Sequence, residues 1–383
     1  MMSLMGIMII FALSYNILLG QTGLLSFGHA VYYGLAGFCV AHAMNYIARE
    51  KIGVPLPFIP LIGAFAGLFF GALFGLISTR RAGTVFSMIS LGIGELVASS
   101  ALILRSFFGG EEGIPTNRTK FPPFFGYKFG PQIEVYYLIA FWCFVCIALM
   151  YALTRTPFGR MCNAVRDNPE RAEFVGYSTQ RVRFIAFVFS AIFAGVAGAL
   201  ATINFELMNS QSLGAGQSGL VLLMTYVGGV GHFIGPIIGG VIITFLQISL
   251  SDITKAWMLY FGLMFILVVM FSPGGVAGWL ALHQPLLKGG RIFRLIPAYA
   301  LALVPMAMLA AGLIMTIELA HRMLVDAQSD GSVMKLAGWT VDAAKAQPWM
   351  LAIGLLVCGA LGLKLAWPKV REAFAAQSAE VAQ

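Results

Sequence analysis

Long runs of apolar residues, separated by short polar segments, follow one another along most of the chain. The runs lie near residues 2–19, 26–47, 58–78, 83–104, 133–153, 184–205, 216–248, 256–272, 298–318 and 348–366. About 20 apolar residues suffice for a helix to cross a hydrocarbon core roughly 30 Å thick. Helices are expected because lipid offers no partner for bare backbone N–H and C=O groups. The pattern therefore predicts an all-α polytopic integral membrane protein.

The run at 216–248 is too long for one ordinary crossing, and the sequence GGVGHFIGP interrupts it. We expect two pieces there, which gives about 10–11 membrane-embedded helical segments, some of them short or re-entrant. The first run lacks a basic region and a small-residue cleavage site, so it predicts a membrane helix rather than a removed signal.

Composition supports lipid as the main solvent of this chain. Its 383 residues are 59% hydrophobic and only 10% charged, whereas soluble proteins carry about 25% charged residues. We expect the net charge of +8 to reflect cytoplasmic loops and anionic lipid rather than nucleic acid. The sequence has no cluster of His, Asp, Glu and Cys near a membrane face that would predict a metal site or a membrane enzyme.

The loop at 154–183 predicts the orientation of the chain. It carries Arg155, Arg160, Arg166, Arg171, Arg181 and Arg183. Loops rich in Lys and Arg stay in the cytoplasm. This assignment places the N-terminus outside the cell and the C-terminus in the cytoplasm.

Small residues recur at every fourth position in two of the predicted helices. Helix 58–78 carries Gly63, Gly67, Gly71 and Gly75, and helix 184–205 carries Ser190, Ala194 and Gly198. Such stripes let helix backbones approach closely in a membrane. We expect tight packing within the chain, with a seam between two subunits as the alternative.

Two glycine-rich segments form a weak internal repeat. They read GQTGLLSFGHAVYYGLAGF at 20–38 and GGVGHFIGPIIGGVII at 228–243, each with a Gly-His pair and a glycine nine residues later. Clustered glycines interrupt helices, and the exposed backbone is tolerated only inside protein or beside a watery cavity. Glycine-broken segments in two halves of a chain point to a transport pathway. The alternative is a pair of ordinary hairpins with polar turns at the membrane surface.

We expect neutral polar groups and glycines of the two breaks, with one carboxylate, to line this pathway. The candidates are Asn16, Gln21, Thr22, Gly23, Ser26, Gly28, His29, Glu95, Gly228, Gly229, Gly231 and His232. Glu95 stands near the middle of helix 83–104, where a charge is costly and faces a cavity or a partner. A structural role, as a hydrogen-bonded carboxylate or a satisfied histidine, is the alternative for Glu95, His29 and His232.

Within the arginine-rich loop, the sequence predicts a short capped helix. Asn168, Pro169 and Glu170 form a typical helix start, with a capping side chain, a proline in the first turn and an acid there. Gly176 follows where a glycine would end the helix. A short polar helix between two membrane spans favours docking on a soluble partner, and a solvated loop against lipid is the alternative.

Several motifs resemble those of one family. RTPFGRMCNAVRDNPERAEFVGYSTQRVRFIAFVFSAIFAGVAGAL, GLLSFGHAVYYGLAGF, SLGIGEL and VGGVGHFIGPIIG are similar to stretches of the permeases of branched-chain amino acid ATP-binding-cassette importers. The resemblance runs from about residue 10 to 280 and implies a permease core at 1–272 that includes the loop 154–183. The remaining residues, 273–383, form an extension with the helix pair 298–318 and 348–366.

The resemblance also implies partners. These are a second permease subunit, two cytoplasmic ATPase subunits and an external substrate-binding protein, all at the inner membrane. ATP and Mg²⁺ would bind the ATPases, because this chain has no GxxxxGK[ST] motif, and no cofactor is expected here. The coupling loop would contact the ATPase through Arg166, Asp167, Asn168, Glu170, Arg171, Ala172 and Gly176.

The implied function is uptake of branched-chain or other hydrophobic amino acids, without enzymatic activity on this chain. The same importer class also carries urea, amides and small aromatic compounds, so these stay open as substrates. A stand-alone secondary transporter or channel is the remaining alternative. The scarcity of membrane-embedded ionisable groups counts against a proton-coupled pump.

Overall fold

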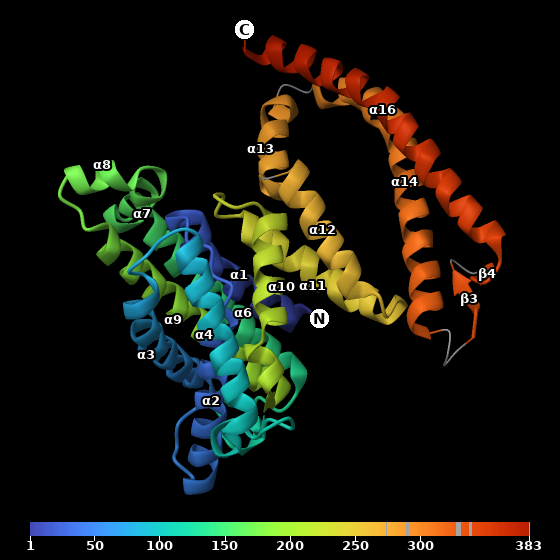
Figure 1. Ribbon diagram of the computed structural model, residues 1–383. Helices are drawn as coiled ribbons and strands as arrows, with labels where there is room; N and C mark the ends of the chain where they lie inside the picture. Colours follow the sequence, from blue (N-terminus) through green and yellow to red (C-terminus); the bar gives the residue numbers. More distant parts are fainter. Residues whose placement is uncertain (273, 289–290, 327–330, 337–338, 383) are drawn as a thin grey trace. The chain divides into compact units, whose positions relative to one another are not determined.

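The computed structural model describes residues 1–272, 274–288, 291–326, 331–336 and 339–382, and these are almost wholly helical (Figure 1). The chain divides into two compact units, each with its own packing. One unit comprises Met1–Asp252 with Phe261–Gly278, and the other comprises Ile253–Tyr260 with Trp279–Gln383.

The first unit contains most of the helices. They are α1 (Met2–Thr22), α2 (Ala30–Glu50), η1 (Leu56–Phe58), α3 (Ile59–Ser78), α4 (Thr84–Ile103), α5 (Arg105–Phe108), η2 (Arg118–Lys120), α6 (Gln132–Arg155), α7 (Pro157–Asp167), α8 (Pro169–Phe174), α9 (Thr179–Phe205), η3 (Ser210–Leu213), α10 (Ala215–Gly228) and α11 (Gly235–Ile253). Two short strands, β1 (Ile114–Pro115) and β2 (Leu207–Met208), pair antiparallel in this unit.

The remaining elements follow α11 in the chain. They are α12 (Trp257–Phe271), α13 (Gly275–Lys288), η4 (Arg291–Leu295), α14 (Ile296–His321), η5 (Arg322–Asp326), β3 (Val333–Leu336), β4 (Trp339–Asp342) and α16 (Ala346–Ala382). Strands β3 and β4 pair antiparallel, with Leu336 opposite Trp339 at the turn.

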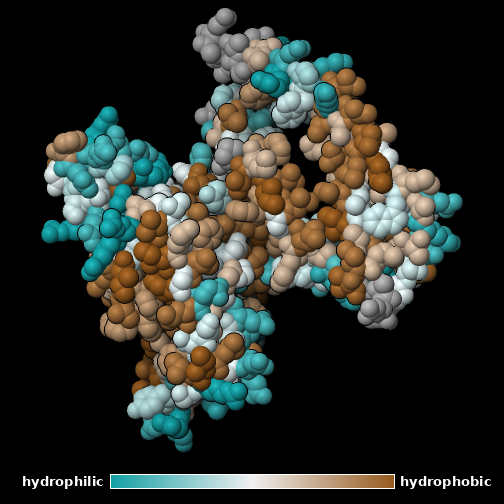
Figure 2. All heavy atoms as spheres, in the orientation of Figure 1, coloured by the Kyte–Doolittle hydropathy of each residue, from teal (hydrophilic) through white to brown (hydrophobic). Residues whose placement is uncertain are grey.

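The prediction of an all-α polytopic membrane protein is confirmed. Within the described ranges, eight helices are long and apolar enough to span a membrane, and the bent pair α12–α13 makes a ninth candidate. The predicted runs also form α2, whose C-terminal half carries polar residues, and α10, which is too short to span alone. Figure 2 shows hydrophilic residues over α7 and α8 and at the opposite end of the first unit, with a mostly hydrophobic surface between them.

Helices α3 and α9 pack at backbone contact, as the glycine stripe of α3 predicts. A Cβ added at Gly63 would lie 2.5 Å from the Gly195 carbonyl oxygen, and one added at Gly67 would overlap the carbonyl oxygen of Ala191. The stripe therefore serves packing within the chain.

The stripe predicted on α9 lies against other helices. The hydroxyl of Ser190 donates to the carbonyl of Ser14 on α1 at 2.6 Å, and a Cβ at Gly198 would overlap the carbonyl of Tyr33 on α2. Helix α9 thus presents small residues on two sides and contacts α1, α2 and α3.

A buried arginine, which was not predicted to be structural, anchors the loop between α5 and α6. The Arg118 guanidinium donates to four backbone carbonyls and to one side-chain oxygen, those of Phe129, Gly130, Ile203, Asn204 and Gln132, at 3.0–3.2 Å. Only 8% of Arg118 is exposed. Nothing in its local sequence distinguishes it from a solvated loop arginine.

In the second unit, α14 and α16 pack along each other. They contain the helix pair expected at 298–318 and 348–366, and α16 continues past Pro368 to Ala382. Glycines again set the contact: a Cβ at Gly359 would lie 2.6 Å from the backbone nitrogen of Leu309.

Replacing Gly67 with valine should destabilise the contact between α3 and α9. The added side chain would force the two backbones apart, at a cost of about 1–3 kcal/mol. We expect a lower unfolding temperature in detergent. Gly262→Val, on the open face of α12 where a Cβ meets nothing within 4 Å, is the matched control. Equal unfolding temperatures of the two variants would contradict the packing role of Gly67.

Candidate functional site

The first glycine break turns the chain back along α1. Helix α1 ends at Thr22, and the glycine that caps it, Gly23, has a φ of +69° in the left-handed region. The phenol of Tyr15 then donates to the carbonyl of Ser26 at 2.9 Å, and the Ser14 hydroxyl lies 3.0 Å from a ring nitrogen of His29. Residues 24–29 therefore run antiparallel to α1, and α2 begins beside the central part of that helix.

Serine hydroxyls from two neighbouring helices satisfy the backbone of this break. On α4, Ser87 donates to the carbonyl of Leu25 at 2.7 Å and Ser90 accepts from the amide of Phe27 at 3.1 Å. On α10, Ser218 accepts from the amide of Ala30, also at 3.1 Å. Non-helical backbone at membrane depth needs such internal partners. These serines were not predicted as functional residues, although the spacing of three between Ser87 and Ser90 on α4 was a usable signal.

Gly28 lets the break lie directly against α4. A Cβ at this position would overlap the carbonyl of Ser90 and would lie 3.3 Å from the Cα of Gly94. The need for glycine here is steric, because the two backbones are in contact.

Buried polar atoms gather around the break. His29 is fully buried and packed by the rings of Phe11, Tyr15 and Tyr32. Four side chains, those of Asn16, Gln21, Ser26 and His29, each have one buried oxygen or nitrogen atom without a hydrogen-bond partner among the described residues. Buried polar atoms in proteins nearly always form a hydrogen bond, so we expect water or a solute to bond these atoms. Thr22 differs, because it donates to the carbonyl of Leu18 on its own helix.

The second break has a different setting. Helix α10 ends at Gly228, and Gly229 and Gly231 follow with φ of +118° and +92°. His232 is exposed, and the ring of Phe233 contacts that of Tyr151 near the end of α6. Gly228 and Gly229 are in backbone contact with Gly235 and Gly274, and a Cβ at either would overlap those carbonyls.

The two breaks do not converge on one point. Ser218, which bonds the first break, lies ten residues before Gly228, so α10 separates the breaks by about 15 Å at 1.5 Å per residue. Asn16, Gln21, Gly23, Ser26 and His29 group around the first break. Gly228, Gly229, Gly231 and His232 group around the second, and Glu95 lies on the exposed face of α4.

The arginine-rich loop folds into two capped helices. The side chain of Asn168 accepts from the amide of Arg171 at 2.9 Å and caps α8, and Gly176, with φ of +93°, follows its end. The predicted short helix is therefore confirmed. Helix α7 was not predicted, although Thr156 and Pro157 give it the same signal of a capping side chain before proline.

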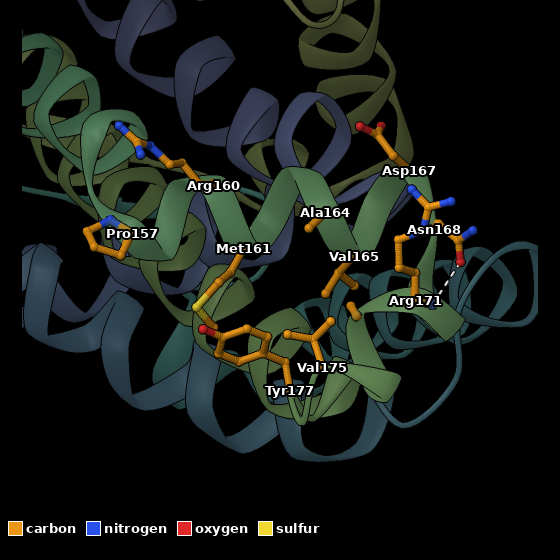
Figure 3. Close-up of a pocket in the computed structure, with 11 residues that line it drawn as sticks. Pro157, Arg160, Met161, Ala164, Val165, Asp167, Asn168, Arg171, Val175 and Tyr177 are labelled. Atoms are coloured by element: carbon orange, nitrogen blue, oxygen red, sulfur yellow. Dashed lines mark hydrogen bonds between the residues drawn. The ribbon is translucent and has the colours of Figure 1, made fainter.

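A groove of about 520 Å³ lies between α7 and α8 (Figure 3). Met161, Val165, Val175 and Tyr177 point into it, while Arg160 and Asp167 lie at opposite ends of α7. Next to the groove, Phe174 is 90% exposed. An apolar groove and an exposed aromatic ring on an otherwise polar helix pair can bind the apolar side chains of a soluble partner.

Arg166 ties this helix pair to the first break. Its guanidinium donates to the carbonyl of Gly20, one of the last carbonyls of α1, and to the carboxylate of Asp167 at 2.9 Å. A Cβ at Gly23 would lie 3.0 Å from the Cγ of Arg166. Helix α7 is therefore bonded directly to the end of α1, where the break begins.

Comparison with known families matches residues 1–272 to the family described as the permease component of the branched-chain amino acid transport system. The high-affinity branched-chain amino acid transport system permease protein LivM of Escherichia coli is 28% identical over 303 residues, which cover 74% of this chain and 69% of that protein. The guanosine ABC transporter permease protein NupQ of Bacillus subtilis is 27% identical over 244 residues, 57% of this chain and 72% of that protein. The search of solved structures gave no match.

Two glycine substitutions should show why each break needs its glycine: Gly28 for lack of space, and Gly231 for its positive φ. Gly28→Ala should lower the unfolding temperature, because its Cβ would overlap the Ser90 carbonyl. Gly231→Asn should be tolerated, because space is open there and asparagine accepts a positive φ. The measurement is thermal unfolding of the detergent-solubilised protein. A larger loss for Gly231→Asn than for Gly28→Ala would contradict the assignment.

Proposed function

The chain belongs to the family of branched-chain amino acid transport permeases, and we propose that it is one of two membrane subunits of an ATP-binding-cassette importer for branched-chain or other hydrophobic amino acids. Its partners are a second permease subunit, two ATPases on the cytoplasmic side and an external substrate-binding protein. The complex lies in the inner membrane, and ATP and Mg²⁺ bind the ATPases rather than this chain.

The α7–α8 pair carries this proposal. It combines an apolar groove, the exposed ring of Phe174 and several arginines on a segment between two membrane spans. The contact surface includes Arg166, Asp167, Asn168, Glu170, Arg171, Ala172 and Gly176. Of these, Asn168 and Gly176 shape α8, Ala172 is buried, and Glu170 is exposed on the first turn.

The contacts support a route from ATPase to pathway. Closure of the ATPases would push α7, and Arg166 would carry that push to the end of α1 through the Gly20 carbonyl. The break at 23–29 then shifts against α4 and α10, to which it is attached through serine hydroxyls. Buried polar atoms of Asn16, Ser26 and His29 would meet water or solute as this region opens.

Transport by the reconstituted complex tests the proposal. The chain, its partner permease and the ATPases are purified together and placed in liposomes with the binding protein. We expect ATP-dependent uptake of leucine, isoleucine or valine and none without the ATPases. Guanosine, urea and short amides are the competing substrates, guanosine because of the similarity to NupQ. Ion-driven uptake by the chain alone would overturn the proposal in favour of a secondary transporter.

Cysteine labelling tests the orientation. A membrane-impermeant thiol reagent added to intact spheroplasts should modify Phe125→Cys, in the loop before α6, and leave Phe174→Cys unmodified. Both phenylalanines are exposed, at 87% and 90%. The unsubstituted chain gives the background, to which Cys162 in α7 adds little because burial raises its pKa to about 12. Labelling of Phe174→Cys from outside would contradict the cytoplasmic site of α8.

Loss of the exposed ring on α8 should weaken binding of the ATPases. Phe174→Asp places a charge in the proposed interface, so we expect at least a tenfold loss of ATPase subunits co-purified with the chain. Phe125→Asp makes the same change on the opposite loop and should leave co-purification unchanged. Equal recovery of ATPases with both variants would remove Phe174 from the interface.

A further inference from the structure

Helix α4 has two faces of different character. Its inner face buries Ser87, Ser90, Gly94, Val97 and Ala101 against the rest of the unit. The opposite face exposes Met88, Gly92, Glu95 and Ser99, which recur at helical spacing. Glu95 lies eleven residues after Thr84 and eight before Ile103, so it is about 12 Å or more from either end of the helix.

Glu95 has no hydrogen-bond or ion-pair partner among the described residues of the chain. A carboxylate at this depth is costly against lipid and is found facing a cavity or a compensating charge. The exposed face of α4 is therefore covered by something other than lipid in the working transporter.

The face of α4 that carries Glu95 is open. A Cβ added at Gly92, one turn before Glu95, would meet no atom within 4 Å. Helix α10 contacts α4, and its Gly216 and Gly219 are likewise open. The first glycine break lies on the inner side of α4, where Gly28 touches Gly94, the residue next to Glu95. Phe27 of the break is 40% exposed and bonds Ser90 through its amide. The carboxylate thus lies one residue from the point where α4 touches the break, on the face of α4 that this chain leaves open.

We propose that Glu95 binds the ammonium group of the transported amino acid, on a pathway that the second permease subunit closes over α4 and α10. This inference rests on the proposed function. A carboxylate and an ammonium attract each other strongly where water is scarce. Uncharged solutes such as nucleosides, urea and amides lack that cation, so Glu95 selects for amines. A single such contact leaves the substrate free to move on.

The reconstituted complex with its binding protein tests this role through Glu95→Gln and Glu95→Asp. We expect at least a tenfold lower turnover of leucine uptake for Glu95→Gln, with subunit assembly and ATPase binding unchanged. Glu95→Asp should recover at least a third of the rate, because it keeps the charge. Glu50→Gln, the same change on an exposed carboxylate at the end of α2, is the control and should transport normally.

A second readout reports contact with the solute. In Ser99→Cys, leucine with ATP and binding protein should slow modification of the thiol several-fold, and adding Glu95→Gln should abolish this protection. Wild-type uptake by Glu95→Gln would overturn the inference while leaving the proposed function intact. Release of the second permease by Glu95→Gln would also overturn it, because the carboxylate would then pair with that subunit. Absence of amino acid uptake by the wild-type complex would instead refute the proposed function.

Discussion

The absence of hydrogen-bond partners in lipid governs the design of this chain. A helix satisfies its own backbone, but residues 24–29 leave the helical path inside the membrane and must find partners elsewhere. They find them in the hydroxyls of Ser87 and Ser90 on α4, and Ser218 on α10 bonds the amide of Ala30 directly after them. The break can exist only because α4 and α10 are in place around it, so this irregular segment depends on tertiary structure.

The same constraint explains the link between the loop and the break. The last carbonyls of α1 have no intrahelical donor, and the Arg166 guanidinium supplies one for Gly20. An arginine that completes the hydrogen bonding of a membrane helix also joins that helix to a surface helix. In the proposed coupling, one contact therefore serves both the stability of α1 and the transmission of movement from α7, so a substitution of Arg166 is expected to affect both.

Sequence patterns predicted those features whose causes are local. The length of the apolar runs predicted the membrane helices, and Asn168 with Pro169 predicted α8. The four-residue spacing of glycines in α3 predicted that a neighbouring helix packs closely against it. The helix that packs against this stripe was harder to predict. Helix α9 carries small residues on two sides, and spacing alone does not assign each of them to a neighbouring helix. Ser190 lies against α1 for this reason, and not against α3.

Features that depend on distant partners were beyond sequence reasoning. Arg118 is an unremarkable loop arginine until the carbonyls of Ile203 and Asn204 come to it from the end of α9. The repeat suggested equivalent breaks, but one is buried beside α1 and the other is open beside α6. The difference arises from the neighbours of each segment, not from its glycines.

The backbone contact between α3 and α9 has a mechanical consequence. Where Gly63 and Gly67 of α3 touch Gly195 and Ala191 of α9, no long side chain lies between the helices that could change rotamer and let them slide. These two helices, with α1 and α2 held on the other side of α9, should move as a rigid body during transport. The hydroxyl bonds at α4 and α10 are the contrasting kind of contact, because water can replace a serine at little cost. Any hinge in this unit is therefore expected where the hydroxyls of Ser87, Ser90 and Ser218 bond the backbone around the first break.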